Sequence, residues 1–265
     1  MKKTLLTLAM MFGGLLSTQA QGSQTLTLDD NEDLVTVINA AAEAGGKYNV
    51  TFSSRDVILD NWDVLCLPFD FRPADLKNYL GTYVICLLNE KGDDGDIHFE
   101  PTVSGTIPAG TPFMINIGKM KRTPTNYKYI TFKDVTVKKV ESSITKTDAS
   151  GNKFISTFSP VDLYGSNYLY MSQSEWYEAE DSVALKALRC YIDYTDNTMT
   201  TLPQIVIGDP TGIIAVLDVK SFNEGKFATK PGQDNGWYTL TGTRLLAAPT
   251  TKGIYIRHGR KVAIK

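Results

Sequence analysis

The sequence is poor in the two residue types that carry most metal-binding and nucleophilic chemistry. Its 265 residues include two histidines, His98 and His258, and three cysteines. It contains no Gly-x-Ser-x-Gly elbow, no His-Glu-x-x-His motif and no glycine-rich phosphate loop with its lysine. With two histidines, the chain has few candidates for the base of a Ser-His-Asp triad, and no two cysteines have the spacing of a zinc loop. We therefore expect a protein that is not an enzyme and that binds no metal or other cofactor.

Long apolar runs are absent, apart from a short one at the N-terminus. Lys2 and Lys3 precede an apolar run over residues 5–16, and residues 18–20, Thr-Gln-Ala, place small side chains before a cleavage site. This is the pattern of a secretory signal peptide. A membrane-spanning helix needs about 20 apolar residues, more than any run here provides. The sequence predicts export through a signal peptide cleaved after Ala20, to the cell surface or the extracellular medium, with the periplasm as an alternative.

The three cysteines, Cys66, Cys86 and Cys190, are an odd number for an exported chain. Each lies in an apolar stretch, where a free cysteine behaves as a small buried hydrophobe. We therefore expect three free, buried thiols. The alternative is one disulfide with a spare thiol.

Positive charge is also scarce. The chain has 27 basic and 29 acidic side chains, and loss of Lys2 and Lys3 with the signal peptide changes the net charge from −2 to −4. No basic cluster occurs outside the C-terminal tail. Nucleic acids and anionic membranes are bound mainly through dense positive charge. We expect neither of them as a partner.

The residues that are present predict a mainly β protein. Short segments rich in β-branched and aromatic residues alternate with Gly, Pro, Asn and Asp, a spacing typical of a β-sandwich. The predicted strands are residues 57–59, 64–69, 83–88, 113–117, 129–140, 168–171 and 188–194. The stretches 64–69 and 83–88 are apolar on both faces and are predicted to be central strands. A slip of the apolar phase predicts a β-bulge at Lys133 and Asp134.

One helix is expected near the start of the mature chain. Asn31 is its predicted N-cap, and a glycine pair at residues 45–46 is predicted to end it. Its apolar face consists of Leu34, Val37, Ile38 and Ala41, which have helical spacing. A second, shorter helical turn is predicted at residues 73–80, with proline in its first turn.

The pattern changes near Pro210. From Trp237 onward the apolar stretches become very short and are separated by glycines, which predicts a small meander of paired hairpins. We therefore divide the chain into a signal peptide (1–20), a β-sandwich body (21–209) and a small C-terminal β-module (210–265).

A group of aromatic side chains is the candidate ligand-binding surface. Tyr168 and Tyr170 share one face of a predicted strand, and Trp176 and Tyr177 follow shortly after. Flat aromatic faces of this kind can stack on sugar rings. The alternative is that these four side chains, like Trp62, fill the interior of the sandwich.

Two acidic clusters are the candidates for catalysis or metal binding. The first, Asp93, Asp94 and Asp96, lies in a segment that resembles a calcium loop only loosely, because no glutamate stands at the twelfth position. A solvated hairpin turn is the preferred interpretation there. The second flanks Trp176 and Tyr177. Carboxylates beside aromatic residues fit a glycosidase, in which two carboxylates lie on either side of a sugar ring, although an exposed loop is the preferred interpretation. Its members are Glu175, Glu178, Glu180 and Asp181.

Several sequence blocks stand out beyond these patterns. They are VTFSSRDVILDNWDVLCLPFDF, IPAGTPFMIN, FISTFSPVDL, ALRCYIDY, GWYTLTGTRLL and KGIYIRHGRKVAIK, between residues 49 and 265. Their order resembles that of a large group of secreted proteins from Bacteroidota. Such regions occur alone or as C-terminal parts of surface proteins, including leucine-rich-repeat adhesins, and the resemblance implies no set of catalytic residues. The last block also resembles the sorting domain of type IX secretion, through Gly253, Tyr255, Lys261, Val262 and Lys265.

Together these patterns predict an exported, non-enzymatic protein of the cell surface or extracellular medium that acts as an adhesion or ligand-binding module. Its candidate ligands are glycans and host or surface proteins. One alternative is a carbohydrate-active hydrolase that uses the loop carboxylates. Another is a structural subunit of a surface assembly, in which strand edges pair with another chain.

Overall fold

The computed structural model describes residues 22–53, 55, 59–120, 131–165, 167–179, 182–194, 202–209, 212–217, 219–220, 237–238, 244–245, 253–257 and 260–264. The predicted signal peptide and part of the predicted strand at 57–59 lie outside these residues. Within the described part of the chain, no helix is long and apolar enough to cross a membrane.

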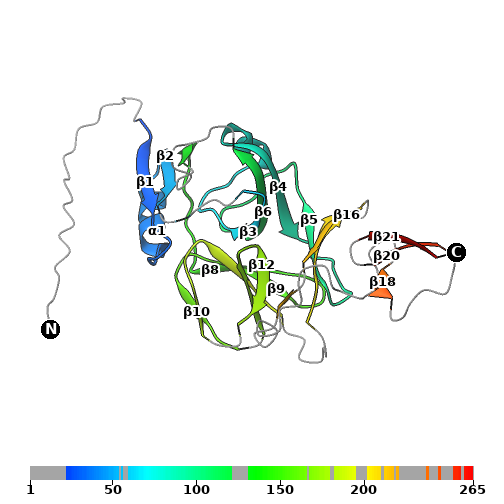
Figure 1. Cartoon of the computed structure of the whole chain (residues 1–265). Helices are drawn as coiled ribbons and strands as arrows, with labels where there is room; N and C mark the ends of the chain where they lie inside the picture. The colour runs from blue at the N-terminus through cyan, green and yellow to red at the C-terminus, as the bar shows by residue number, and fades with distance from the viewer. Residues whose placement is uncertain are drawn as a thin grey trace, which may run out of the picture.

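A parallel β-α-β unit opens the fold (Figure 1). β1 (Gln24–Leu28) pairs in parallel with β2 (Tyr48–Phe52), and α1 (Val35–Ala44) connects them. β7 (Thr131–Val135) adds an antiparallel third strand to β2. The unit is therefore a three-stranded sheet of order β1-β2-β7.

The helix forms at the predicted place, with two differences in detail. Val37 is exposed, whereas the rest of the predicted apolar face is buried. The prediction of Asn31 as N-cap was wrong, because the helix begins later, at Val35, whose backbone N–H donates to Asp33 Oδ1. Gly45 ends the helix with a φ of 71°, a conformation that glycine adopts without strain.

The body contains two six-stranded sheets. The first has the order β16-β15-β5-β4-β6-β3. Its members are β3 (Trp62–Leu65), β4 (Leu80–Leu88), β5 (Ile97–Pro101), β6 (Phe113–Met120), β15 (Ile205–Asp209) and β16 (Gly212–Leu217), and the 3-10 helix η1 (Pro73–Asn78) precedes β4. β4 is a central strand, as predicted, and η1 lies within the predicted helical turn.

The prediction of a central strand at 64–69 was wrong, because β3 lies at the edge of its sheet. The apolar character of this stretch has another cause. After Leu65 the chain leaves β3 and passes through the core, where Leu67 and Phe69 are fully buried. Burial on all sides in a core segment leaves the same apolar pattern as burial in a central strand.

The second sheet has the order β17-β12-β11-β14-β9-β8. Its members are β8 (Ser143–Thr147), β9 (Lys153–Thr157), β11 (Tyr168–Ser172), β12 (Glu175–Glu178), β14 (Arg189–Asp193) and β17 (Val219–Lys220). A separate pair, β10 (Val161–Leu163) with β13 (Val183–Leu185), forms a small apolar cluster against which Tyr168, Tyr170 and Tyr191 pack. These three tyrosines lie on the face of the sheet away from the main core.

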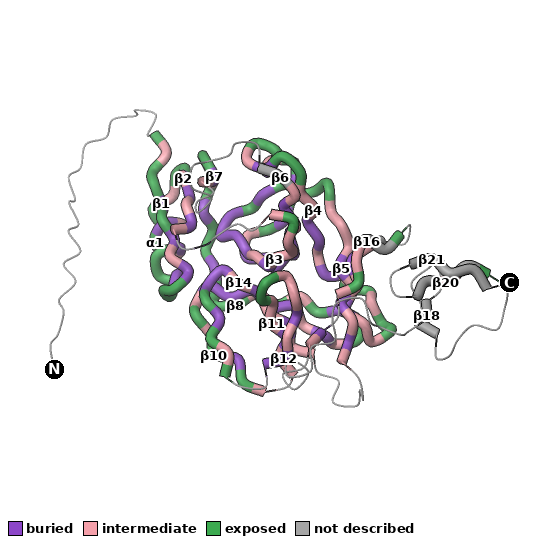
Figure 2. The backbone as a smooth tube through the Cα atoms, viewed as in Figure 1, coloured by how far each residue is buried: buried purple, intermediate pink, exposed green. Residues whose placement is uncertain are grey.

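The main core lies between the two six-stranded sheets. Phe99 of β5 contacts Phe154 of β9 with ring centroids 5.0 Å apart, and Phe154 contacts Trp176 of β12 at 6.5 Å. All three side chains are fully buried. Figure 2 shows the buried stretches on the inner segments of the body and the exposed ones on its outer turns. The predicted mainly β fold with a sandwich-like body is confirmed.

β7 contains a bulge at the predicted position. Tyr48 and Val50 of β2 face Val135 and Phe132 of β7, so β7 has one residue more than β2 between these pairs. Asp134, inside the bulge, has a φ of 57°. The predicted phase slip at residues 133–134 is therefore a real irregularity of the sheet, although the strand is shorter than the predicted 129–140.

The predicted domain boundary at residue 210 falls between two paired strands. β15 and β16 form an antiparallel hairpin, and β17 pairs in parallel with β12. Both β16 and β17 therefore belong to the sheets of the body. β18 (Trp237–Tyr238), β19 (Arg244–Leu245), β20 (Gly253–Arg257) and β21 (Arg260–Ile264) form a four-stranded sheet of their own, of order β19-β18-β20-β21. The division into two domains stays a prediction.

The three cysteines are free and buried, as predicted. Burial raises the pKa of the Cys86 thiol to about 12. Burial and the neighbouring Cys66 raise the pKa of Cys190 well above its ordinary value. The thiols of Cys86 and Cys190 are therefore protonated at neutral pH, and all three cysteines serve as small core residues.

Candidate ligand-binding groove

A groove of about 450 Å³ opens beside the start of β3. Three parts of the chain form it: the start of β3, the β11–β12 hairpin, and the segment from β13 to the start of β14. They bring together Trp62, Asp63, Tyr170, Gln173, Lys186 and Arg189. Its volume lies within the range of about 300–1,000 Å³ that is typical of small-molecule sites.

Trp62, Tyr170 and Met171 supply part of the apolar surface of the groove, together with residues 183–185 of β13. The ring of Tyr170 stacks on that of Tyr177, with centroids 5.7 Å apart and an interplanar angle of 29°. Tyr177 is itself held by a hydrogen bond from its hydroxyl to Glu175 Oε2, at 2.7 Å. This support limits the motion of the Tyr170 ring. Ligand binding therefore costs little side-chain entropy at this residue.

A chain of ion pairs lies behind and along the groove. Asp63 binds two arginines, with its Oδ2 2.7 Å from Arg55 Nη2 and its Oδ1 3.3 Å from Arg189 Nη1. The buried Asp30 pairs with Arg189 as well and with one further cation, its Oδ2 lying 3.7 Å from Arg189 Nη2 and its Oδ1 3.6 Å from Lys186 Nζ. Burial, and secondarily the charge of Arg55, lowers the pKa of Arg189. Three cations and two carboxylates leave this cluster with a net charge of one positive unit.

The turn between β11 and β12 has a backbone conformation that non-glycine residues rarely adopt. Gln173 and Ser174 both have positive φ values, 51° and 68°, as the central residues of a type I′ turn require. Each such residue costs about 1–2 kcal/mol. Ser174 Oγ donates to the backbone carbonyl of Trp62 at 3.0 Å, which joins the turn to β3.

Two more residues with positive φ lie next to the groove. Asp60, with a φ of 59°, precedes the lining residue Asn61, and the fully buried Leu188, with a φ of 60°, precedes Arg189. Arg55 Nη1 donates to the carbonyl of Leu188 at 2.7 Å. In the described part of the chain, four of the five non-glycine residues with positive φ thus lie in or beside the groove. Such strain accumulates at functional sites.

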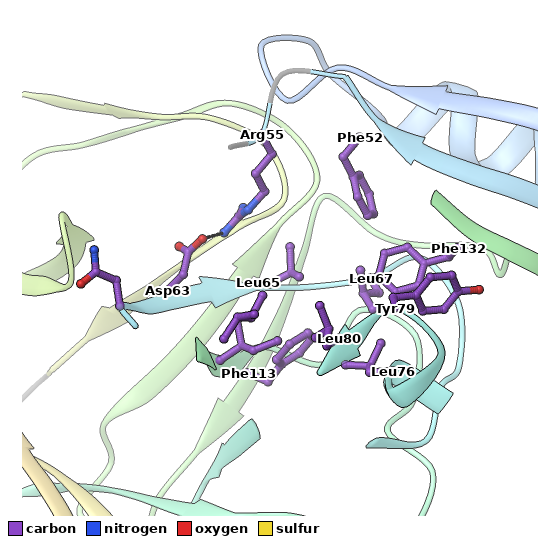
Figure 3. A pocket seen from close by; sticks show the side chains of 13 residues that line it. Phe52, Arg55, Asp63, Leu65, Leu67, Leu76, Tyr79, Leu80, Phe113 and Phe132 are labelled. Atoms are coloured by element: carbon purple, nitrogen blue, oxygen red, sulfur yellow. Dashed lines mark hydrogen bonds and ion pairs between the residues drawn. The ribbon is translucent and has the colours of Figure 1, made fainter. Parts of the chain in front are cut away.

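A second cavity shares Asn61 and Asp63 with the groove but differs from it in character. Figure 3 shows leucine and phenylalanine side chains around it, with the Arg55–Asp63 ion pair at one end. Its volume is about 50 Å³. Even a benzene-sized ligand occupies a cavity of about 150 Å³. We therefore treat it as a gap in the packing and not as a ligand site.

Of the four aromatic residues that the sequence singled out, one lines the groove. Tyr170 does so, and Tyr177 supports it from outside the lining. Tyr168 packs edge-on against Tyr191, with ring centroids 5.9 Å apart, and does not reach the groove. The assignment of Trp176 to an exposed aromatic surface was wrong, because its side chain has 0% exposure and points into the core. Alternation along β12 explains this, since adjacent residues of a strand point to opposite faces.

The acidic segment at 175–178 is strand β12 and not the expected loop. Glu175 pairs with Lys220 Nζ at 2.5 Å, and this hydrogen bond lowers its pKa. Glu178 is buried on the other face, where its Oε1 accepts a hydrogen bond from Tyr194 Oη at 2.7 Å. These two carboxylates therefore do not converge on one substrate. Glu180 and Asp181 lie outside the described residues.

The first acidic cluster forms the turn between the antiparallel strands β4 and β5, as predicted. His98 Nε2 lies 2.8 Å from Asp94 Oδ1, and Asp96 accepts a hydrogen bond from the backbone of Gln204 at 2.9 Å. Burial raises the pKa of Asp96. Among the described residues, no group of three His, Cys, Asp or Glu side chains could hold a metal ion.

Sequence reasoning did not single out Asp63, Lys186 or Arg189. The available signal was the charge of Asp63 and Arg189 within otherwise apolar stretches. A charge in a buried strand needs a partner, so each pattern indicated an ion pair. The partner could not be identified, because the two residues are 126 positions apart in the chain.

Comparison with known proteins adds nothing to this geometry. No protein-family model, curated protein or solved structure matches the chain. The groove and the sequence patterns are therefore the two sources from which a function can be inferred.

Proposed function

We propose that this protein is an exported, non-enzymatic module of the cell surface or extracellular medium that binds saccharides in the groove between β3, β11 and β14. The proposal of export rests on the signal-peptide pattern of residues 1–20. The resemblance of the sequence blocks to secreted Bacteroidota proteins supports the same location. The ligand site rests on the groove.

The observation that carries the ligand site is the open groove together with its strained, tightly bonded backbone. A strained turn persists only where the surrounding structure holds it, and here Ser174 is bonded to β3 while Leu188 is bonded to Arg55. The groove is thus formed before any ligand arrives. A preformed site avoids the entropic cost of ordering its walls on binding.

A saccharide fits the chemistry of the lining better than a purely apolar ligand. Sugars present apolar ring faces and a rim of hydroxyl groups. Trp62 and Tyr170 offer aromatic surface to the former, and Asn61, Gln173 and Ser172 offer amide and hydroxyl groups to the latter. Half of this lining is polar in character, as a hydroxylated ligand requires.

A glycan array with the mature protein and two tyrosine variants tests the proposal. Tyr170→Ala removes a lining residue, whereas Tyr168→Ala removes a ring from the same strand and face that does not reach the groove. We expect the wild type to bind a set of glycans, Tyr170→Ala to lose at least about tenfold in affinity for them, and Tyr168→Ala to keep it. Absence of binding by the wild type, or equal losses in both variants, contradicts a saccharide site in the groove.

The hydrolase alternative receives less support. Glu175 and Glu178, its two described carboxylates, point to opposite faces of β12, whereas a glycosidase needs both on one sugar, roughly 5–10 Å apart. We expect glycans bound on the array to remain uncleaved after long incubation with the wild type. Release of new reducing ends, and its loss in Glu175→Gln, would restore the hydrolase interpretation.

A further inference from the structure

We infer that the groove selects saccharides that carry a carboxylate, such as sialylated or uronate-containing glycans, and binds that carboxylate with Arg189 and Lys186. This inference rests on the proposed saccharide function and specifies its ligand class. It starts from the uneven distribution of charge in a protein that is acidic as a whole.

The cations of the groove outnumber the carboxylates that face them. Arg55 makes three hydrogen bonds within the protein, to Asp63 and to the carbonyls of Val64 and Leu188, and it does not line the groove. Asp63 is shared between Arg55 and Arg189. Among the described residues of this cluster, Arg55, Lys186 and Arg189 pair with two carboxylates, Asp30 and Asp63. These pairs leave one positive charge that an anionic ligand can balance.

Arg189 has donors to offer a ligand. A guanidinium carries five N–H groups, and the hydrogen bond from Arg189 Nη1 to Asp63 uses one of them. Its Nη2 lies 3.7 Å from Asp30 Oδ2, close enough for an ion pair but beyond hydrogen-bonding distance. The side chain lines the groove and is 28% exposed. The planar fork of arginine fits a carboxylate through two parallel hydrogen bonds.

Lys186 supplies a second, more accessible cation. It lines the same groove, is 49% exposed, and lies 3.6 Å from the buried Asp30. Asp30 thus holds both cations from behind while their other donors remain on the groove side. Asp30 is only 1% exposed, so it contacts these cations from inside the protein and does not line the groove.

The burial of Arg189 strengthens the case for an anionic ligand. Desolvation lowers its pKa, so the charged form lacks part of the stabilisation that water gives. A carboxylate delivered by a ligand replaces that stabilisation. Hydrogen bonds between charged groups are about twice as strong as neutral ones, and more so in a partly buried site.

Calorimetric titration with matched pairs of saccharides tests the inference. One pair is sialyllactose with lactose, and the other is a hyaluronan tetrasaccharide with the same compound after reduction of its carboxyl groups to alcohols. We expect at least one acidic member to bind about tenfold or more tightly than its neutral partner, with the preference weakening as salt rises. The member that binds identifies the source of the carboxylate as sialate or uronate.

Variants assign the preference to the two cations. Lys186→Gln, at a half-exposed position, should reduce affinity for the acidic saccharide several-fold without changing affinity for the neutral partner, and Arg189→Gln should reduce it further. Lys146→Gln is the matched control, because Lys146 is 42% exposed on β8, at the far edge of the same sheet, and lies outside the groove lining. It should leave the preference unchanged.

The possible failures are distinguishable. Equal affinity of the wild type for the acidic and neutral members overturns the carboxylate inference and leaves saccharide binding intact. A preference that survives both Lys186→Gln and Arg189→Gln also overturns it, because the anion then binds elsewhere. Absence of binding to any saccharide, neutral or acidic, overturns the proposed function and the inference with it.

Discussion

Arg55 joins three parts of the chain that meet at the groove. Its side chain is 6% exposed and donates to Asp63 Oδ2 and to the carbonyl of Leu188, both at 2.7 Å. It also donates to the carbonyl of Val64. Removing one partner of a buried ion pair leaves the remaining groups unsatisfied in a medium of low polarity, and this is more costly than loss of a surface contact.

Arg55→Ala should therefore lower the free energy of unfolding by about 3 kcal/mol or more. Arg72→Ala is the control, since Arg72 is 65% exposed and its ion pair with Asp75 is solvated. That variant should lose far less, because an exposed ion pair contributes little to stability. Urea denaturation of the two variants measures both values. Equal losses contradict the assignment of Arg55 as the central connection of the groove.

Burial of Cys86 makes the stability of the protein depend on pH in alkaline solution. Its thiol has an ordinary pKa of 9.0, and burial raises the value to about 12. The folded state therefore holds the proton more tightly than the unfolded state. This contribution is fully present below pH of about 9, and it is lost at about 1.4 kcal/mol per unit as pH rises toward 12.

Comparison with Cys86→Ala isolates this effect from other titrating groups. Between pH 9 and pH 11 the free energy of unfolding should fall more steeply for the wild type than for the variant, even though the variant starts from a lower value. Parallel curves would show that the thiol is solvated in the folded state.

At the scale of elements, β12 explains why two neighbouring glutamates have different roles. Its burial alternates, with Trp176 and Glu178 on the core face and Glu175 and Tyr177 on the outer face. Glu178→Ala should cost about 1–3 kcal/mol of stability, because it removes the buried carboxylate that accepts a hydrogen bond from the half-buried Tyr194 hydroxyl. Glu175→Ala should cost less than about 1 kcal/mol, since its pair with Lys220 is solvated. Thermal unfolding of the two variants distinguishes them, and a larger loss in Glu175→Ala contradicts the assigned orientation of β12.

Sequence patterns predicted several elements with strong apolar or aromatic character, but they missed the apolar strands β15 and β16 as well as polar ones. β4, β6, β11 and β14 were predicted, and so was the bulge of β7. β8 and β12 were not, because Ser143–Thr147 is polar and Glu175–Glu178 alternates glutamate with aromatic residues, a composition shared by exposed loops. The parallel pairing of β1 with β2 was also missed. Pairing partners depend on contacts between distant parts of the chain, which local periodicity does not contain.

The same limit applied to the site. Tyr170 could be selected because its strand was predicted and its face followed from alternation. Trp176 was misplaced because its segment was taken as a loop. Prediction of the charged half of the groove required knowledge of which strands lie side by side. Asp63 and Arg189 come from β3 and β14, which are far apart in the sequence.

At the scale of the whole molecule, the body sheets use no strand beyond Lys220 among the described elements. A chain truncated after Pro249, which lacks β20 and β21, should therefore keep a folded body with a urea midpoint close to that of the full chain. If the last block is a working sorting signal, this variant should fail to reach the surface of the cell. Correct placement of the truncated protein contradicts a sorting role, and an unfolded body contradicts the independence of the body sheets.

The central claim is that a saccharide occupies the groove, and the indole N–H signals of Trp62 and Trp176 report on it most directly. Trp62 lines the groove, whereas Trp176 is buried in the core. In a two-dimensional NMR titration with a glycan selected on the array, the Trp62 signal should shift progressively and saturate, while the Trp176 signal stays in place. Saturable shifts of other signals without one of Trp62 would place the ligand outside the groove and contradict the account.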